Sequence, residues 1–241
     1  MKFVSTAALG LVLALGASGL VVATPAVAAK KEKKAEPAKK NWNLSKEFRA
    51  AAVPVEAAVT GKKFDEALAG LPALETVSKT PDEKYILASY RYNAGLGKQD
   101  MKQQYLGASG MLLSGGAASS QTLDLANASG RLAFQLKDYR NAKAHFEQAK
   151  TVGLNMSDSF IFLAESNFQL NDIPSGLAAA EQAVKLEQAA GRPIPSSWID
   201  RVESVLYKAK MGEEMGKWAR LNVKNSPTKE NWRNQMINYW G

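Results

Sequence analysis

One stretch of the sequence occurs twice, and this duplication constrains the fold more than any other feature. Residues 133–150 read AFQLKDYRNAKAHFEQAK, and residues 167–184 read NFQLNDIPSGLAAAEQAV. Phe134 returns as Phe168, and the same offset aligns the two copies over their whole length without a gap. A period of this size, about 34 residues, is typical of stacked helical repeats, in which each unit buries its apolar face against the next.

Each copy is predicted to form two helices joined by a short turn. In the first copy, residues 123–136 are periodically apolar, Lys137 and Asp138 suit a turn, and residues 139–152 suit a second helix. Spacings of three and four residues place four side chains of the second helix on one face: Tyr139, Ala142, Phe146 and Ala149. We therefore expect this face to be buried.

Small residues occur where the helices of each copy must approach each other closely. Gly130 and Ala142 hold these positions in the first copy, and Ala164 and Gly176 hold them in the second. A glycine inside a helix costs about 1 kcal/mol relative to alanine. Close helix packing at these sites is the expected reason for accepting that cost.

These residues carry a resemblance to a known family, the tetratricopeptide repeat. Its pattern is W-x2-L-G-x2-Y…A-x3-F…P, repeated every ~34 residues. The first copy matches the glycine and the A-x3-F pair with Gly130, Ala142 and Phe146. The W-x2-L-G positions of the second copy hold Phe160, Leu163 and Ala164. The resemblance implies stacked helix pairs in a right-handed superhelix, with the first helix of each pair lining the concave side.

The rest of the chain is predicted to extend this architecture. The clearest repeats are residues 123–156 and 157–190, and residues 44–78 read as a diverged first repeat. The glycine- and serine-rich residues 114–120 are expected to connect the second and third repeats. A fifth, stretched repeat is expected to follow residue 190.

Helix boundaries are marked by capping residues. Thr80 is a predicted cap and Pro81 a predicted first helical residue. Gly95 and Gly97 are expected to end that helix. A partner helix is expected over residues 101–113.

A last helix is expected after Pro227. It places Trp232, Met236 and Tyr239 on one face, and we expect it to cover the apolar end of the stack, with Trp240 beside it. Ligand binding by Trp232 and Trp240 is the alternative. The predicted fold is therefore all-α: a right-handed α-α superhelix of about five helix pairs with a C-terminal capping helix, over residues 42–241.

The N-terminal residues have the composition of an export signal. Residues 1–29 contain Lys2, an apolar run and an A-x-A site at residues 26–28, so a cleaved signal peptide and a periplasmic or secreted protein are expected. The alternative is a membrane anchor formed by residues 3–29, because the uncharged run is long enough to span a bilayer. The chain contains no cysteine, so disulfide bonds cannot contribute to stability.

The basic excess is concentrated in a short segment. The formal net charge is +8, and residues 29–40 alone carry six lysines and two glutamates. We expect residues 30–41 to form a solvated linker. Lys30 to Lys40 is alternatively a weak contact for anionic lipid or cell-wall surfaces. The folded part shows no concentrated basic face, so nucleic-acid binding is not expected.

The sequence lacks the constellations that carry catalysis. His145 is the only histidine and lies at a position that repeat packing explains. The connector lacks the G-x-x-x-x-G-K-S/T of a phosphate loop and the G-x-S-x-G of a nucleophile elbow. We therefore expect no catalytic residue, no metal site and no cofactor, and we predict that the protein is not an enzyme.

The remaining candidates are side chains that face the expected concavity. Register places seven residues there: Arg91, Asn127, Arg131, Phe134, Glu165, Phe168 and Gln169. A solvated helix face is the alternative interpretation of each. The leading hypothesis is a non-enzymatic scaffold of the bacterial cell envelope that binds a protein or peptide in its groove. The alternative hypothesis is an envelope tether or spacer that uses the basic tail.

Overall fold

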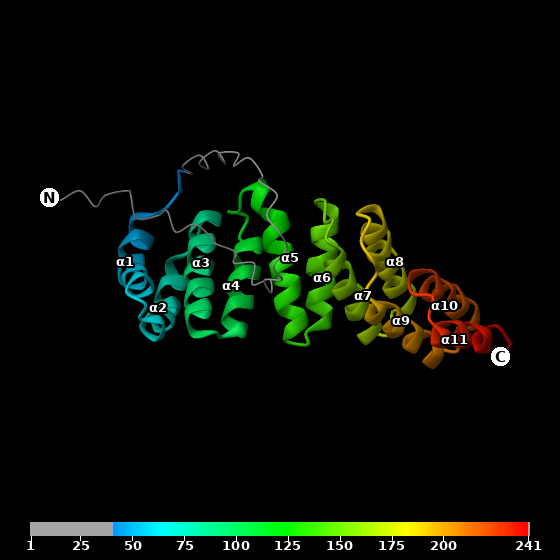
Figure 1. The fold of residues 1–241 in the computed structure, drawn as a ribbon. Coiled ribbons are helices and arrows are strands. Elements are labelled where there is room, and N and C mark those ends of the chain that lie inside the picture. Colours follow the sequence, from blue (N-terminus) through cyan, green and yellow to red (C-terminus); the bar gives the residue numbers. More distant parts are fainter. Residues whose placement is uncertain (1–40, 241) are drawn as a thin grey trace, which may run out of the picture. The chain divides into compact units, whose positions relative to one another are not determined.

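The computed structural model describes residues 41–240, which form eleven helices and no strand (Figure 1). The predictions for the signal segment, and for the linker up to residue 40, lie outside this part of the chain. None of the eleven helices is both long enough and apolar enough to cross a bilayer.

The helices follow one another with short connections. Their bounds are α1 Lys46–Thr60, α2 Phe64–Val77, α3 Pro81–Lys98, α4 Met101–Leu113, α5 Ser119–Gln135, α6 Tyr139–Thr151, α7 Ser157–Gln169, α8 Ile173–Ala189, α9 Ser196–Lys208, α10 Gly212–Asn225 and α11 Lys229–Trp240.

Neighbouring helices pack as antiparallel pairs that stack in chain order. The pairs are α1/α2, α3/α4, α5/α6, α7/α8 and α9/α10, and each pair contacts the next through its second helix. The first helices of neighbouring pairs also touch, as in α1 against α3 and α5 against α7. This order is visible in the colour sequence of Figure 1. The all-α prediction is confirmed, and the stacking of adjacent pairs fits a helical repeat.

One turn geometry recurs inside every pair. A non-glycine residue with a left-handed backbone, φ between 55° and 61°, separates the two helices: Lys62, Gln99, Lys137, Asn171 and Lys210. The N–H of the following residue donates to the carbonyl five residues earlier, at 2.8 to 3.0 Å. This is the Schellman pattern, which satisfies carbonyls that a helix end leaves unpaired. All five pairs therefore share this turn, whereas the sequence repeat is clear in only two of them.

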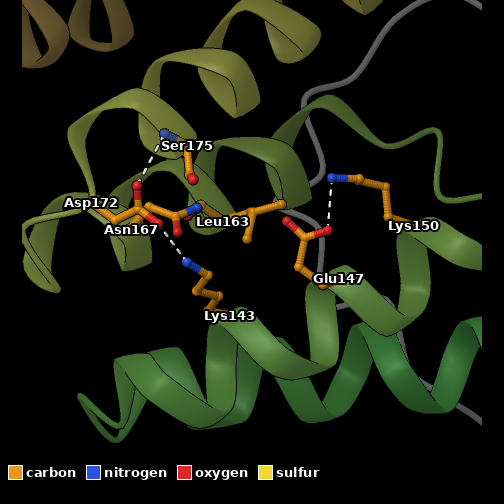
Figure 2. A network of polar contacts seen from close by, with 7 residues as sticks. All are labelled: Lys143, Glu147, Lys150, Leu163, Asn167, Asp172 and Ser175. Carbon is orange, nitrogen blue, oxygen red and sulfur yellow. Dashed lines mark hydrogen bonds and ion pairs between the residues drawn. The ribbon is translucent and has the colours of Figure 1, made fainter.

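Aspartates cap three of the helices that follow these turns, α4, α6 and α8. The backbone N–H of Asn141 donates to Asp138, and that of Ser175 donates to Asp172, at 3.2 and 3.3 Å. Figure 2 shows Lys143 of α6 reaching the second carboxylate oxygen of Asp172, at 2.7 Å. That hydrogen bond lowers the pKa of Asp172 below its ordinary value. The repeated aspartate thus ends a turn, and in the second copy it also joins neighbouring pairs.

The start of α3 is fixed by a buried carboxylate. Thr80 and Glu83 form a capping box, and Pro81 opens the helix, as predicted. Glu83 is fully buried and accepts backbone N–H groups from Ser45, Lys79 and Thr80, at 2.7 to 2.8 Å. Burial raises its pKa, but these hydrogen bonds outweigh burial and hold the pKa at about 2. Glu83 therefore joins the start of α1 to the start of α3.

The predicted end of α3 is wrong. Gly95 and Gly97 lie inside α3, which continues to Lys98. A Cβ at Gly95 would lie 2.6 Å from the backbone nitrogen of Gln104, and one at Gly97 would lie 2.1 Å from the ring of Phe64. Both glycines therefore allow neighbouring helices to approach α3 rather than ending it.

The stack ends with α1 on one side and α11 on the other. α1 begins at Lys46 and continues through Pro54. α11 contacts α10, and Trp232 and Met236 on α11 are 53% and 57% exposed. The side chains of Tyr239 and Trp240 lie outside the described part of the chain.

Candidate functional site

Between the third and fourth pairs a phenyl ring fills the core. Phe146 of α6 is completely buried, and a Cβ at Gly130 of α5 would lie 2.9 Å from its ring. The ring also lies parallel to Phe162 of α7, with centroids 6.3 Å apart and an interplanar angle of 12°. The predicted close approach at Gly130 is thus confirmed, since the absence of a side chain there admits the ring.

One repeat later this ring is missing. The repeat offset aligns Ala180 of α8 with Phe146, and it aligns Ala164 of α7 with Gly130. Ala180 and Ala164 both line a cavity of about 160 Å³. The position that a phenyl ring fills in the third repeat is thus lined by alanines in the fourth repeat, and space remains there.

Four helices contribute to the wall of this cavity, and most of the wall is apolar. The lining residues are Phe134 of α5; Ile161, Phe162, Ala164, Glu165 and Phe168 of α7; Ala180 of α8; and Ser197, Trp198, Arg201 and Val202 of α9. We refer to it below as the α7/α9 cavity.

The aromatic wall of the α7/α9 cavity is accessible. Phe134, Phe162 and Trp198 are all half-buried rather than enclosed. The rings of Phe134 and Phe162 lie 4.9 Å apart at a tilt of 50°, an arrangement that favours aromatic contact. An engineered apolar cavity of about 150 Å³ is large enough to bind benzene. The α7/α9 cavity therefore suits one ring or one branched aliphatic side chain.

An empty cavity of this size lowers stability. Residual cavities cost about 24 cal/mol per Å³, so 160 Å³ corresponds to at most about 4 kcal/mol. The upper limit applies to an enclosed cavity, and the α7/α9 cavity reaches the surface at Arg201, which is 40% exposed. A ligand group that fills the cavity would recover part of this free energy.

One ion pair spans the edge of the cavity. The guanidinium of Arg201 donates two hydrogen bonds to the carboxylate of Glu165, at 2.7 and 2.8 Å. Gln169 donates a third, at 2.7 Å. Burial raises the pKa of Glu165, but hydrogen bonds from Arg201 and Gln169 outweigh it and lower the pKa. This carboxylate is therefore held ionised, and it links α7 to α9.

A second guanidinium lies beside the aromatic wall. Arg131 of α5 covers the ring of Phe162, with its central carbon 4.8 Å from the ring centroid. No acidic side chain within residues 41–240 pairs with Arg131. A stacked guanidinium uses its face for the ring, and its edge N–H groups stay free to bind a carboxylate.

The remaining predicted site residues are engaged elsewhere in the stack. Arg91 donates to Gln103 at 3.2 Å. Asn127 accepts from the hydroxyl of Ser159 at 2.7 Å. Neither Arg91 nor Asn127 lines the α7/α9 cavity.

Phe168 both faces the cavity and packs in the core. It lines the cavity, but it is buried, and a Cβ at Gly176 would lie 2.3 Å from its ring. Phe168 therefore packs against α8 as well as lining the cavity. Phe134, its equivalent in the first copy, packs edge-on against Tyr139 of the following helix, with ring centroids 5.7 Å apart.

The linker between α8 and α9 is held by polar contacts on both of its sides. Glu187 of α8 accepts from the hydroxyl of Ser157 and binds Arg192 in two hydrogen bonds, at 2.6 and 2.9 Å. Hydrogen bonds from Arg192 and Ser157 lower the pKa of Glu187 to about 2, although burial opposes them. The backbone of Ile194 exchanges two hydrogen bonds with Asn225 of α10, at 2.9 and 3.0 Å.

Within residues 41–240, the cavity lining contains neither the one histidine nor a metal-binding group of side chains. Residues 41–240 contain no group of three or more histidine, aspartate or glutamate side chains that could hold a metal ion. His145 is buried edge-on to the ring of Tyr105, with centroids 6.0 Å apart, and burial lowers its pKa. His145 therefore lies in the core, away from the α7/α9 cavity lining.

Sequence reasoning missed several residues of the cavity. Phe162 and Arg201 carry no sequence signal, because neither is a position of the repeat pattern. The loss of the aromatic residue at Ala180 was a readable signal: the spacing Ala142-x3-Phe146 becomes Gly176-x3-Ala180 in the second copy.

Comparison with known proteins adds no family to this description. No protein-family model matches the sequence, and a search of curated proteins finds no match.

Proposed function

We propose that this protein is a non-enzymatic scaffold that binds a protein or peptide segment on the surface formed by α5, α7 and α9. The proposed architecture is a right-handed, tetratricopeptide-like superhelix, in which these first helices line the concave side. The proposed setting is the bacterial cell envelope, which follows from the export-signal composition of residues 1–29.

The observation that carries this proposal is the α7/α9 cavity. Three half-buried aromatic side chains, Phe134, Phe162 and Trp198, surround a space of about 160 Å³. Binding energy at protein interfaces is concentrated in a few buried aromatic or arginine anchors that fill such pockets. Four helices hold this cavity in place, so a ligand does not need to order it.

Selection of peptides from a random library against the full chain tests this proposal. The selected peptides should bind the wild type at least about ten-fold more tightly than the Phe162→Ala and Trp198→Ala variants. The control is Tyr207→Ala, because Tyr207 is 73% exposed on α9 and does not line the cavity. Peptides that bind all four proteins equally would show that binding occurs elsewhere.

A further inference from the structure

The fourth repeat lacks an aromatic side chain that the third repeat uses for packing. In the third repeat the ring of Phe146 fills the space between α5, α6 and α7 and lies parallel to Phe162. In the fourth repeat Ala180 takes its place, and Trp198 of α9 lines the space in front of it. The chain thus contains a filled example and an unfilled example of the same site.

Charge around the cavity is asymmetric. Glu165 and Arg201 neutralise each other at the edge. Arg131 lies over the Phe162 ring and has no acidic partner within the described helices. The polar groups near the aromatic wall therefore leave one positive charge without a counter-ion, and that charge complements an acidic ligand group.

We infer that the α7/α9 cavity binds a peptide segment in which a phenylalanine-type ring lies next to an acidic side chain. The ring takes the position that Phe146 takes one repeat earlier, and the carboxylate pairs with the edge of Arg131. The volume of about 160 Å³ accommodates a single ring, and the aromatic side chains Phe134, Phe162 and Trp198 in the lining favour a ring over an aliphatic side chain. This inference rests on the proposed function, and it names the chemistry of the partner.

Four short synthetic peptides test it with the full chain. All four are acetylated and amidated, so that only side chains carry charge. They have a central phenylalanine between glutamates, between glutamines or between lysines, and a central alanine between glutamates. Fluorescence polarisation at fixed ionic strength gives their affinities. We expect the peptide with phenylalanine and glutamates to bind at least about ten-fold more tightly than the alanine peptide. It should bind about three-fold more tightly than the glutamine peptide, and the lysine peptide should bind most weakly of the three phenylalanine peptides.

Two variants test the two proposed contacts separately: the ring in the cavity and the carboxylate at Arg131. Ala180→Leu places a side chain in the cavity and should remove the preference for phenylalanine over alanine. Its matched control is Ala178→Leu, since Ala178 is exposed on the same helix. If Ala180→Leu does not fold, the smaller Ala180→Val serves the same purpose. Arg131→Gln should remove the preference for glutamate over glutamine and keep the preference for the ring. Arg140→Gln, at an exposed position of α6, is its control.

The outcomes separate this inference from the proposed function. Binding that ignores the central ring, binding that ignores the flanking charge, or a ring preference that survives in both Ala180 variants would overturn the inference and leave groove binding intact. No binding by any of the four peptides would overturn the inference. If library selection also yields no ligand dependent on Phe162 and Trp198, the proposed function fails as well.

Discussion

The interface between the third and fourth helix pairs and the interface between the fourth and fifth differ in one main respect. In the first, Phe146 is fully buried against the neighbouring helices. In the second, Ala180 lines a cavity, and an ion pair between Glu165 and Arg201 joins α7 to α9. The comparison teaches that stacked helix pairs can give either a closed core or an accessible site, and the side chain at the position of Phe146 and Ala180 is one determinant of which forms.

The number of residues between successive turns also differs between these two interfaces. The left-handed turn residues Lys137 and Asn171 are separated by one repeat period, whereas the interval from Asn171 to Lys210 is longer. The longer interval includes a linker held by Glu187, Arg192 and other polar groups rather than by a filled core. Polar contacts therefore add to the apolar packing of Ile199 and Val202 in holding the fifth pair.

Removing the ring from the closed interface should have the largest effect. Phe146→Ala should lower the free energy of unfolding by about 3 to 5 kcal/mol, because it creates a cavity in a filled core. Trp198→Ala should cost about 2 kcal/mol or less, since Trp198 is half-buried and already faces a cavity. Urea denaturation of both variants checks this order. Equal losses would mean that the two interfaces are packed alike.

Weakening the linker contacts should have the next largest effect. Glu187→Gln should lower the free energy of unfolding by about 2 kcal/mol, because a buried charged acceptor of three hydrogen bonds is replaced. The folded-state pKa of Glu187 is about 2, below its ordinary value of 4.5, so its contribution is present above about pH 4.5. That contribution is lost as the pH falls towards 2.

The free energy of unfolding of the wild type and of Glu187→Gln, measured as a function of pH, checks the direction of this pH dependence. Between pH 4.5 and 2 the wild type should lose more stability than Glu187→Gln, although Glu83, whose pKa is also about 2, makes both proteins acid-sensitive. Identical acid profiles would show that the linker carboxylate does not stabilise the fold.

Filling the open interface should raise stability. Ala180→Leu should increase the free energy of unfolding by about 1 kcal/mol, because it buries new apolar atoms in existing space. Ala178→Leu, on the exposed side of α8, should change it by less than about 0.5 kcal/mol. Thermal denaturation of the pair measures the difference. A destabilised Ala180→Leu protein would indicate that the space is too small or already occupied.

The ion pair at the cavity edge should contribute least. Arg201 is 40% exposed, so solvent screens its attraction to Glu165, and we expect a coupling energy of about 1 kcal/mol or less. A double-mutant cycle with Glu165→Gln and Arg201→Gln measures it. A coupling well above this value would make the ion pair, rather than α9 packing, the main connection between the fourth and fifth pairs.

The sequence predicted the all-α stack of helix pairs because repeat signals are local. The repeat offset, the Thr80-Pro81 entry and the packing of Gly130 all depend on spacing along one or two helices. The end of α3 was mispredicted because Gly95 is needed by a neighbouring helix, and that requirement cannot be read from α3 alone.

The site was predicted only in part for the same reason. Phe134 and Glu165 line the cavity, but the partner of Glu165 is Arg201, which lies on α9 in the stretched repeat. The helix register predicts Arg91 and Asn127 as site residues. The cavity, however, forms where an aromatic side chain is missing from α8. The informative residue was Ala180, whose role is visible only when it is compared with Phe146.

One titration tests most directly whether the missing ring leaves an accessible binding site. Benzene is added to ¹⁵N-labelled full chain, and the indole N–H signal of Trp198 is followed by NMR, with its assignment taken from Trp198→Phe. The account predicts a saturable shift of this signal in the wild type and in Ala178→Leu, and no shift in Ala180→Leu. An unchanged signal in the wild type, or the same shift in Ala180→Leu, would contradict it.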